Sequence, residues 1–131
     1  MALAAFLSAV FTLLNPIRTT YHSEAPQDAA RPFFVLQPLP GPVAYCFGTS
    51  AIEQPRLQIS QYYDWTGQSE QAVTDNVAII AALDRQTLTA DGIMMQRINQ
   101  PAIQVLGGGP GSTGPRVLQM RQDWKFEYLS S

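Results

Sequence analysis

Hydrophobic and polar residues alternate along residues 117–129, close to the end of the chain. Alternation with a period of two is typical of a β-strand that buries one face. The apolar face would consist of Leu118, Met120, Trp124, Phe126 and Tyr128, with Gln122 among them. The opposite face carries four charges of alternating sign: Arg121, Asp123, Lys125 and Glu127. We therefore expect a closing strand with one face in the core and the other facing solvent or a neighbouring molecule.

Similar patterns predict further short strands, each bounded by residues that favour turns. The clearest covers residues 56–63, and weaker patterns predict strands at 33–37, 43–47, 93–98 and 102–107. The strand at 33–37 is followed by a turn at 38–42 that holds three prolines and a glycine. Proline donates no ladder hydrogen bond, so this strand is expected to end near a sheet edge. We expect the next strand, 43–47, to pair back across the proline turn, and residues 48–55 to form a loop.

The first 17 residues, MALAAFLSAVFTLLNPI, are apolar almost all round. Such a run predicts a helix buried on several sides, and Asn15-Pro16 should end it because proline disfavours helical geometry in the residue before it. The run is shorter than the ~20 apolar residues that a helix needs to span a bilayer. A cleaved signal peptide is the alternative, although no Lys or Arg precedes the run. Residues 17–32 are polar and are expected to form an exposed connection.

Residues 68–85 predict a long amphipathic helix. Its apolar face would consist of Ala72, Val73, Val77, Ile79, Ile80 and Leu83. Its polar face would consist of Glu70, Gln71, Thr74, Asp75 and Arg85. Asn76 intrudes on the apolar face and is expected to lie at a boundary or to be hydrogen-bonded there, because an unpaired buried amide costs about 1–3 kcal/mol.

Together these elements predict a single α+β domain over residues 1–131. Its sheet would be mixed, mainly antiparallel and about four to five strands wide. The N-terminal helix and the long amphipathic helix would both pack on this sheet.

Composition narrows the function classes. Charged residues make up 14% of the chain, against about 25% in an average protein, and fewer surface charges keep copies apart less strongly. The net charge is −2 and no basic stripe appears, so sequence-specific nucleic-acid binding is not expected. The single cysteine, Cys46, excludes an internal disulfide and is expected to pack as a small hydrophobe.

No motif predicts catalysis or a bound cofactor. The glycine-rich loop 107–115 lacks the lysine and the following helix of a phosphate-binding loop. The lone histidine, His22, has no metal-ligand spacing around it, and the acidic residues are scattered without a pair suited to acid–base work. We therefore expect no enzyme activity, no cofactor and no metal. The charged face of the closing strand is either a solvated face or a contact with an adjacent copy.

The order of elements, with RPFFVLQPLPG, PRLQIS and the closing RQDWKFEYLS, resembles the tail terminator (tail completion) proteins of long-tailed bacteriophages along essentially the whole chain. The resemblance implies a structural virion protein that forms a ring, usually of six subunits, at the head-proximal end of the tail tube. Such a ring stops tube polymerisation and joins the tail to the head. The implied partners are other copies, the tail tube protein and a head completion or connector protein, with DNA passing through the lumen and no membrane involved.

Within this resemblance, the exposed loops are the best candidates for the ring's rims. They include Pro40 and Gly41 in the proline turn, and Gly108 and Gly109 in the glycine loop. The subunit interface is expected on the surface or edge of the sheet, including Arg121, Asp123, Lys125 and Glu127. A head-to-tail connector or minor capsid component is the alternative from the same assembly. The more distant alternatives for the function are a small enzyme, a ligand-binding domain and a secreted domain.

Overall fold

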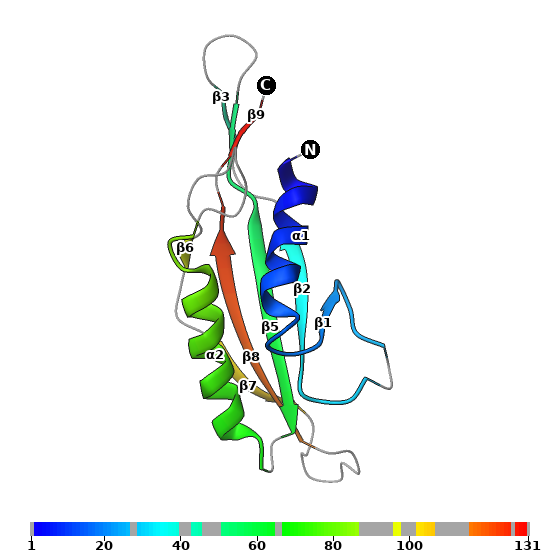
Figure 1. The fold of residues 1–131 in the computed structure, drawn as a ribbon. Coiled ribbons are helices and arrows are strands. Elements are labelled where there is room, and N and C mark those ends of the chain that lie inside the picture. The colour runs from blue at the N-terminus through cyan, green and yellow to red at the C-terminus, as the bar shows by residue number, and fades with distance from the viewer. Residues whose placement is uncertain are drawn as a thin grey trace.

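The computed structural model describes residues 2–26, 29–39, 43–45, 51–64, 67–86, 96–97, 102–106, 116–126 and 128–130. Two helices and two β-sheets account for most of these residues (Figure 1). The α+β class is confirmed, as is the mixed and mainly antiparallel character of the sheet, although the main sheet has six strands. Among the described residues, no helix has both the length and the apolar character needed to cross a bilayer.

The main sheet is centred on two long antiparallel strands, β5 (Arg56–Asp64) and β8 (Val117–Lys125). On the other side of β5 lie β2 (Phe33–Leu39), antiparallel to it, and then β1 (Thr20–His22), which is parallel to β2. The edge of β8 away from β5 pairs with two short strands. β6 (Gln96–Arg97) lies beside the end of β8, and β7 (Ala102–Leu106) lies beside its first half. The predicted strand at 56–63 is confirmed, and the connection predicted at 17–32 contains β1.

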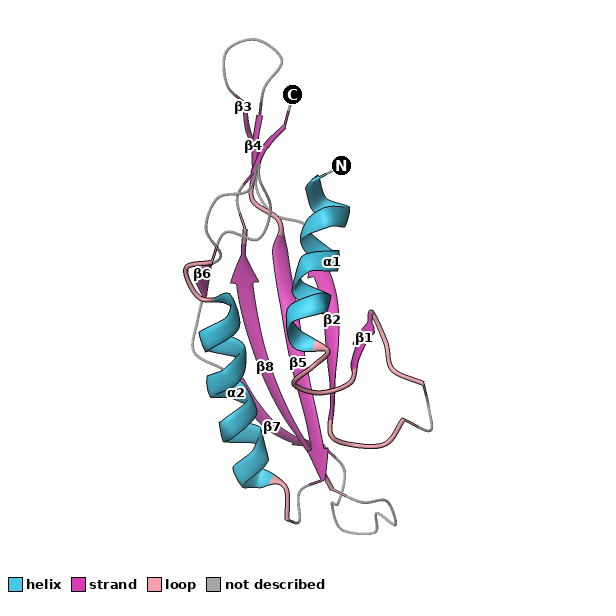
Figure 2. Cartoon of the chain, in the orientation of Figure 1, coloured by secondary structure: helices cyan, strands magenta, loops and turns pink. Residues whose placement is uncertain are grey.

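A second sheet of three strands consists of β3 (Val43–Tyr45), β4 (Ala51–Glu53) and β9 (Tyr128–Ser130) (Figure 2). β3 pairs with β4, so the expected pairing of the 43–47 strand across the proline turn is wrong. The expected loop at 48–55 contains β4. The closing strand predicted over 117–129 is divided between β8 in the main sheet and β9 in the small one.

The two sheets share one continuous ribbon. Ala51 pairs with Ser130 in the small sheet, and Arg56 pairs with Lys125 in the main sheet, five residues further along each strand. Pro55 separates β4 from β5 and has no N–H to donate, so the ladder is interrupted there. The carbonyl oxygen of Pro55 still accepts a 3.1 Å hydrogen bond from the N–H of Phe126. The ribbon therefore keeps its register through the junction.

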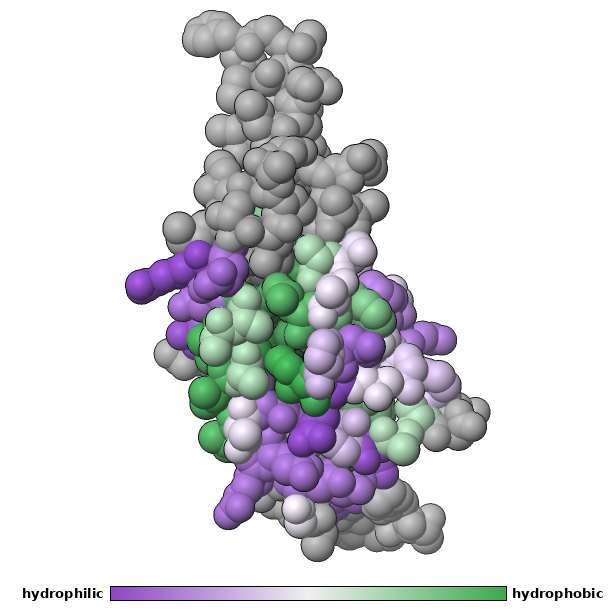
Figure 3. Space-filling view, in the orientation of Figure 1, coloured by the Kyte–Doolittle hydropathy of each residue, from purple (hydrophilic) through white to green (hydrophobic). Residues whose placement is uncertain are grey.

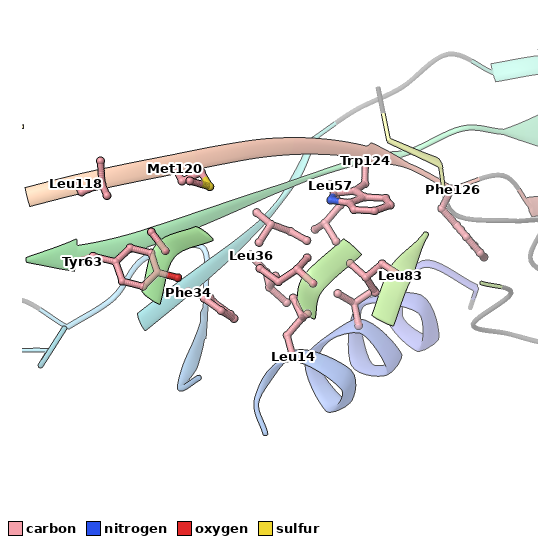
Figure 4. Packing of buried hydrophobic residues seen from close by; sticks show 14 residues of the cluster. Leu14, Phe34, Leu36, Leu57, Tyr63, Leu83, Leu118, Met120, Trp124 and Phe126 are labelled. Atoms are coloured by element: carbon pink, nitrogen blue, oxygen red, sulfur yellow. The ribbon is translucent and has the colours of Figure 1, made fainter. Parts of the chain in front are cut away.

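Both helices, α1 (Ala2–Leu14) and α2 (Ser69–Leu83), cover the same face of the main sheet. Figure 4 shows the core between them, with side chains of β2, β5 and β8 pointing towards the helices. The largest fully buried side chains are Trp124, Tyr63, Phe34, Phe126, Leu14, Leu36, Leu57, Ile59, Ile79 and Leu83. The predicted burial of Trp124 and Phe126 is confirmed.

α1 ends at Leu14, as the following Asn15-Pro16 predicted. The amide groups of Ile17 and Arg18 donate to the carbonyl oxygen of Leu14 and close the helix end. Over residues 7–14, however, only a stripe containing Val10 and Leu14 is fully buried, and Leu13 is exposed. The prediction that α1 is buried on several sides is therefore wrong for this part of the helix, which packs along one face.

The buried face of α2 differs from the predicted one. Ala72, Ile79 and Leu83 are buried as expected, but Val73 and Val77 are 60% and 62% exposed. Asp75, predicted on the solvent face, is only 4% exposed. The helix is turned so that a carboxylate enters the interior and two valines leave it. The physical reason lies in the polar groups that surround Asp75, which are described next.

Candidate functional site

The face of the main sheet opposite the helices carries the charged residues of β8. Arg121 is exposed, and Asp123 and Lys125 are half-buried. Their side chains alternate with the buried Gln122 and Trp124, as the sequence pattern predicted. No described helix covers this face of the sheet. The structure therefore brings together three of the four residues predicted to form a subunit interface.

Cross-strand pairing adds a fourth charge that the sequence reading missed. Arg56 of β5 lies directly opposite Lys125, and Arg121 lies opposite Ser60 in the same ladder. Arg56, Arg121 and Lys125 thus form a group of three cations, here named the basic strip, and Asp123 lies between Arg121 and Lys125 on the same face of β8. Like charges directly opposite one another in a sheet are destabilising. An antiparallel pairing of 56–64 with 117–125 would have been needed to foresee this cluster.

The other end of the same face is closed by its own side chains. The rings of Phe33 and Tyr62 stack with centroids 5.0 Å apart, and Tyr21 meets Phe33 edge-on at 5.7 Å. Gln119 Nε2 donates a 3.0 Å hydrogen bond to Tyr62 Oη. Tyr62 and Gln119 are half-buried at this end, whereas Arg56 and Arg121 of the basic strip are exposed.

On the helix side, a chain of hydrogen bonds crosses the interior. Arg18 Nε and Tyr63 Oη both donate to Asp75 Oδ2, at 2.8 and 2.7 Å. Gln61 Nε2 donates to Tyr63 Oη at 2.7 Å and to the carbonyl oxygen of Ala72 at 3.3 Å. These contacts connect the segment after α1, the strand β5 and the helix α2. They give Asp75 two donors in place of water, which is why a carboxylate can occupy the buried face.

The chain continues into β8. Gln61 Oε1 accepts hydrogen bonds from Asn76 Nδ2 at 3.3 Å and from Gln122 Nε2 at 3.2 Å. Trp124 Nε1 donates to Gln122 Oε1 at 3.2 Å. The seven residues whose side chains form this chain are named the polar network: Arg18, Gln61, Tyr63, Asp75, Asn76, Gln122 and Trp124. The prediction that Asn76 is hydrogen-bonded at the edge of the apolar face is confirmed. One sign of the other members is visible in the sequence: Gln61 and Gln122 occur in the alternating series of apolar residues, so both are expected on the core side of their strands.

Burial and the hydrogen bond to Asp75 raise the pKa of Tyr63 far above its ordinary value of 10.0. The phenol therefore stays protonated and donates to the carboxylate throughout the physiological range. Within the described residues, no group of three or more His, Cys, Asp or Glu side chains is placed to hold a metal ion. The polar network thus joins elements of the fold, with its donors and acceptors directed at one another.

The remaining predicted interface residues lie outside the described part of the chain: Pro40, Gly41, Gly108, Gly109 and Glu127. Cys46 and most of the predicted strand at 93–98 also lie outside it. His22 lies at the end of β1, exposed, with its ring stacked on Phe11 at a centroid distance of 5.0 Å.

The fold and these surfaces define a class of protein: a small α+β domain that carries charged side chains of β5 and β8 on the sheet face away from its two described helices (Figure 1). A family model described as "Tail completion protein gp17" matches residues 1–122. The chain belongs to this family of phage tail completion proteins, as its resemblance to tail terminators predicted. It is therefore a structural protein of a bacteriophage tail and a component of the virion. A search of curated proteins found no match.

Proposed function

We propose that the protein forms a closed ring, with six copies as the expected number, at the head-proximal end of the tail tube. The ring ends tube polymerisation and provides the surface that the head completion protein binds. The protein acts through these contacts and catalyses no reaction. Its membership of a tail completion family supports the general role, and the structure supports the contact between copies.

The observation that carries the ring proposal is the basic strip on the sheet face that no described helix covers (Figure 1). Arg56 and Lys125 face each other directly across two strands, with Arg121 on the same face. Within an isolated subunit Arg56 and Lys125 repel each other, because like charges directly opposite in a ladder are destabilising. A neighbouring subunit that brings carboxylates to this face would turn the repulsion into attraction. Charged groups at such an interface also fix the register of the two partners.

A ring requires two different surfaces on each copy, because closed cyclic assemblies larger than dimers use head-to-tail contacts. The far face of the sheet supplies one of them in this proposal. The tube and the head partner would then meet the ring's two rims. Pro40, Gly41, Gly108 and Gly109 remain the proposed rim residues. The net charge of −2 suits a lumen through which DNA slides without being held.

The mass of the purified protein by light scattering, together with negative-stain images, tests the ring. We expect a ring mass and visible rings, and we expect these rings to bind one end of isolated tail tubes. Arg121→Glu and Lys125→Glu should each weaken assembly while circular dichroism stays unchanged. Glu24→Lys, a charge reversal of equal size at an exposed position just after β1, is the matched control. Normal rings from both strip variants would overturn the assignment of this face, and rings that bind heads but never tubes would favour a connector.

A further inference from the structure

Most of the exposed large apolar side chains among the described residues belong to α2 and β7. Five large hydrophobic residues are exposed among the described residues, and four of them belong to these two elements: Val73, Val77, Ile103 and Val105. These four residues are named the apolar shelf. Figure 3 shows hydrophobic surface over α2 at the edge of the molecule. Contiguous exposed apolar surface on a soluble domain usually marks a place where a partner binds.

The strand register and the hydrogen bonds of α2 place the four shelf residues on the same side of the main sheet, the side that the helices cover. Ile103 and Val105 lie opposite Met120 and Leu118 in the ladder, so they point to the helix side of the sheet. On α2, Asn76 donates to Gln61, whose oxygen also accepts from Gln122 of β8. This side of the helix therefore faces β8 and the edge beyond it. At about 100° per residue, Val73 and Val77 are rotated from Asn76 by about 60° and 100°, in the direction away from Asp75, so they lie on the outer part of the β8 side of the helix.

The shelf is bordered by acidic residues. Glu70, Val73 and Val77 are spaced three and four positions apart, which places them in one row along α2, and Asp84 follows seven positions later as the residue just after the helix. Glu70 is exposed and Asp84 is half-buried. Neither α2 nor β7 contains a Lys or Arg. The shelf thus combines an apolar centre with carboxylates at both ends of its row, whereas the basic strip consists of three cations.

We infer that the apolar shelf of one copy is covered by the basic strip face of the next copy. The long side chains of Arg121 and Lys125 would pack their aliphatic stems on the valines and reach the flanking carboxylates with their charged heads. The two surfaces are different and lie on the same chain, so each copy can present both, as a head-to-tail ring requires. This inference rests on the proposed ring and names the surface that its charged face contacts.

Two variants that each damage one surface test the pairing. Val77→Glu damages the shelf and leaves the strip intact, and Arg121→Glu does the reverse. Both positions are exposed, so both variants should fold, and helical circular dichroism checks this. Each variant alone should assemble at least tenfold less well than the wild type. Gln71→Glu adds the same charge to an exposed position of α2 outside the row and should assemble normally.

Mixing the two variants gives the decisive result. The strip of Val77→Glu and the shelf of Arg121→Glu are both intact, so one normal contact can form per pair. The remaining two surfaces are the shelf of Val77→Glu and the strip of Arg121→Glu. Both carry an added glutamate, so they should not bind each other. We therefore expect one-to-one dimers and no rings.

The outcomes separate the inference from the proposed function. Normal rings from Val77→Glu, or a mixture that stays monomeric, would overturn the shelf assignment and leave the ring intact. Normal rings from Val77→Glu that no longer bind tail tubes would assign the shelf to the tube protein. A wild-type protein that remains monomeric at all concentrations would overturn both.

Discussion

Arg18 and Asp75 lie 57 positions apart in sequence, and their side chains meet at 2.8 Å between Nε and Oδ2. Arg18 follows α1 and Asp75 lies in α2, so the ion pair joins the two helices on one side of the sheet. The side chain of Asp75 is 6% exposed and that of Arg18 is 31% exposed. The pair therefore consists of a buried carboxylate held by a partly solvated cation and by Tyr63.

Asp75→Ala should destabilise the protein by about 2–4 kcal/mol, because it leaves Arg18 and the Tyr63 hydroxyl without their acceptor. The exposure of Arg18 keeps the loss towards the lower part of this range. Urea denaturation measures it. Asp64→Ala is the matched control, since its 2.6 Å pair with Arg31 has side chains 43% and 28% exposed and should contribute less than about 1 kcal/mol. Equal losses in the two variants would contradict the structural role given to Asp75.

Tyr63 should make the protein sensitive to alkali. Its folded-state pKa is raised above the ordinary 10.0, so above pH 10 the unfolded chain releases this proton while the folded chain keeps it. The free energy of unfolding is therefore unaffected by this group below pH 10 and falls by about 1.4 kcal/mol per pH unit above it. Tyr63→Phe should remove this part of the slope, and Tyr62→Phe should retain it. Identical slopes in the two variants, measured by urea denaturation, would exclude the raised pKa.

Gln61 is the most connected member of the polar network, with hydrogen bonds to Tyr63, Ala72, Asn76 and Gln122. Gln61→Met keeps a similar volume but leaves several buried polar groups unpaired, and should cost about 2–4 kcal/mol. Gln58→Met, three residues earlier on the opposite sheet face, should cost less than about 0.5 kcal/mol. Thermal denaturation compares the two. A tolerated Gln61→Met would mean that the neighbouring amides find other partners.

The orientation of α2 is testable by alanine substitution. Ile79 is fully buried, and Ile79→Ala should cost about 2–4 kcal/mol through lost packing and a residual cavity. Val77→Ala should change the free energy of unfolding by less than about 0.5 kcal/mol, because Val77 is 62% exposed. Measurements on the dilute, unassembled protein avoid any contribution from contacts between copies. A large loss for Val77→Ala under these conditions would place the helix in the orientation predicted from sequence.

Lys125→Glu should affect the subunit and the assembly in opposite directions. It replaces a like-charge pair with Arg56 by an attractive one, which should stabilise the isolated subunit by about 0.2–1 kcal/mol. The same change removes a cation from the proposed interface and should weaken assembly. Denaturation at low concentration and sedimentation at high concentration measure the two effects. A variant that is both less stable and normally assembled would contradict both parts of the argument.

The strands and helices were largely predictable because their signals are local. Alternation located β5 and β8, and Asn15-Pro16 located the end of α1. The resemblance to tail completion proteins was likewise visible in the sequence, and the family match confirms it. The predictions that were wrong concern features that depend on contacts between residues distant in sequence. The helical projection placed Asp75 outside because a carboxylate alone belongs in water, and nothing nearby in sequence reveals Arg18 and Tyr63.

The candidate interface was partly predictable for the same reason. The alternation that buried Trp124 also set Arg121, Asp123 and Lys125 on the other face. Arg56 was missed because its position opposite Lys125 follows from the pairing of two strands that are separated by more than fifty residues. The apolar shelf was missed because periodicity assigned Val73 and Val77 to the core. Hydrophobic periodicity finds apolar residues but does not distinguish those that fold the chain from those left for a partner.

The ribbon that runs through both sheets has a mechanical consequence. The pairing of 51–53 with 128–130 and that of 56–64 with 117–125 keep one register across Pro55, so the small sheet cannot slide along the large one. A load applied to the small sheet would be passed along two covalent chains directly into the strands that hold the core. The missing proline N–H weakens the pairing at that point, and bending under such a load should concentrate there.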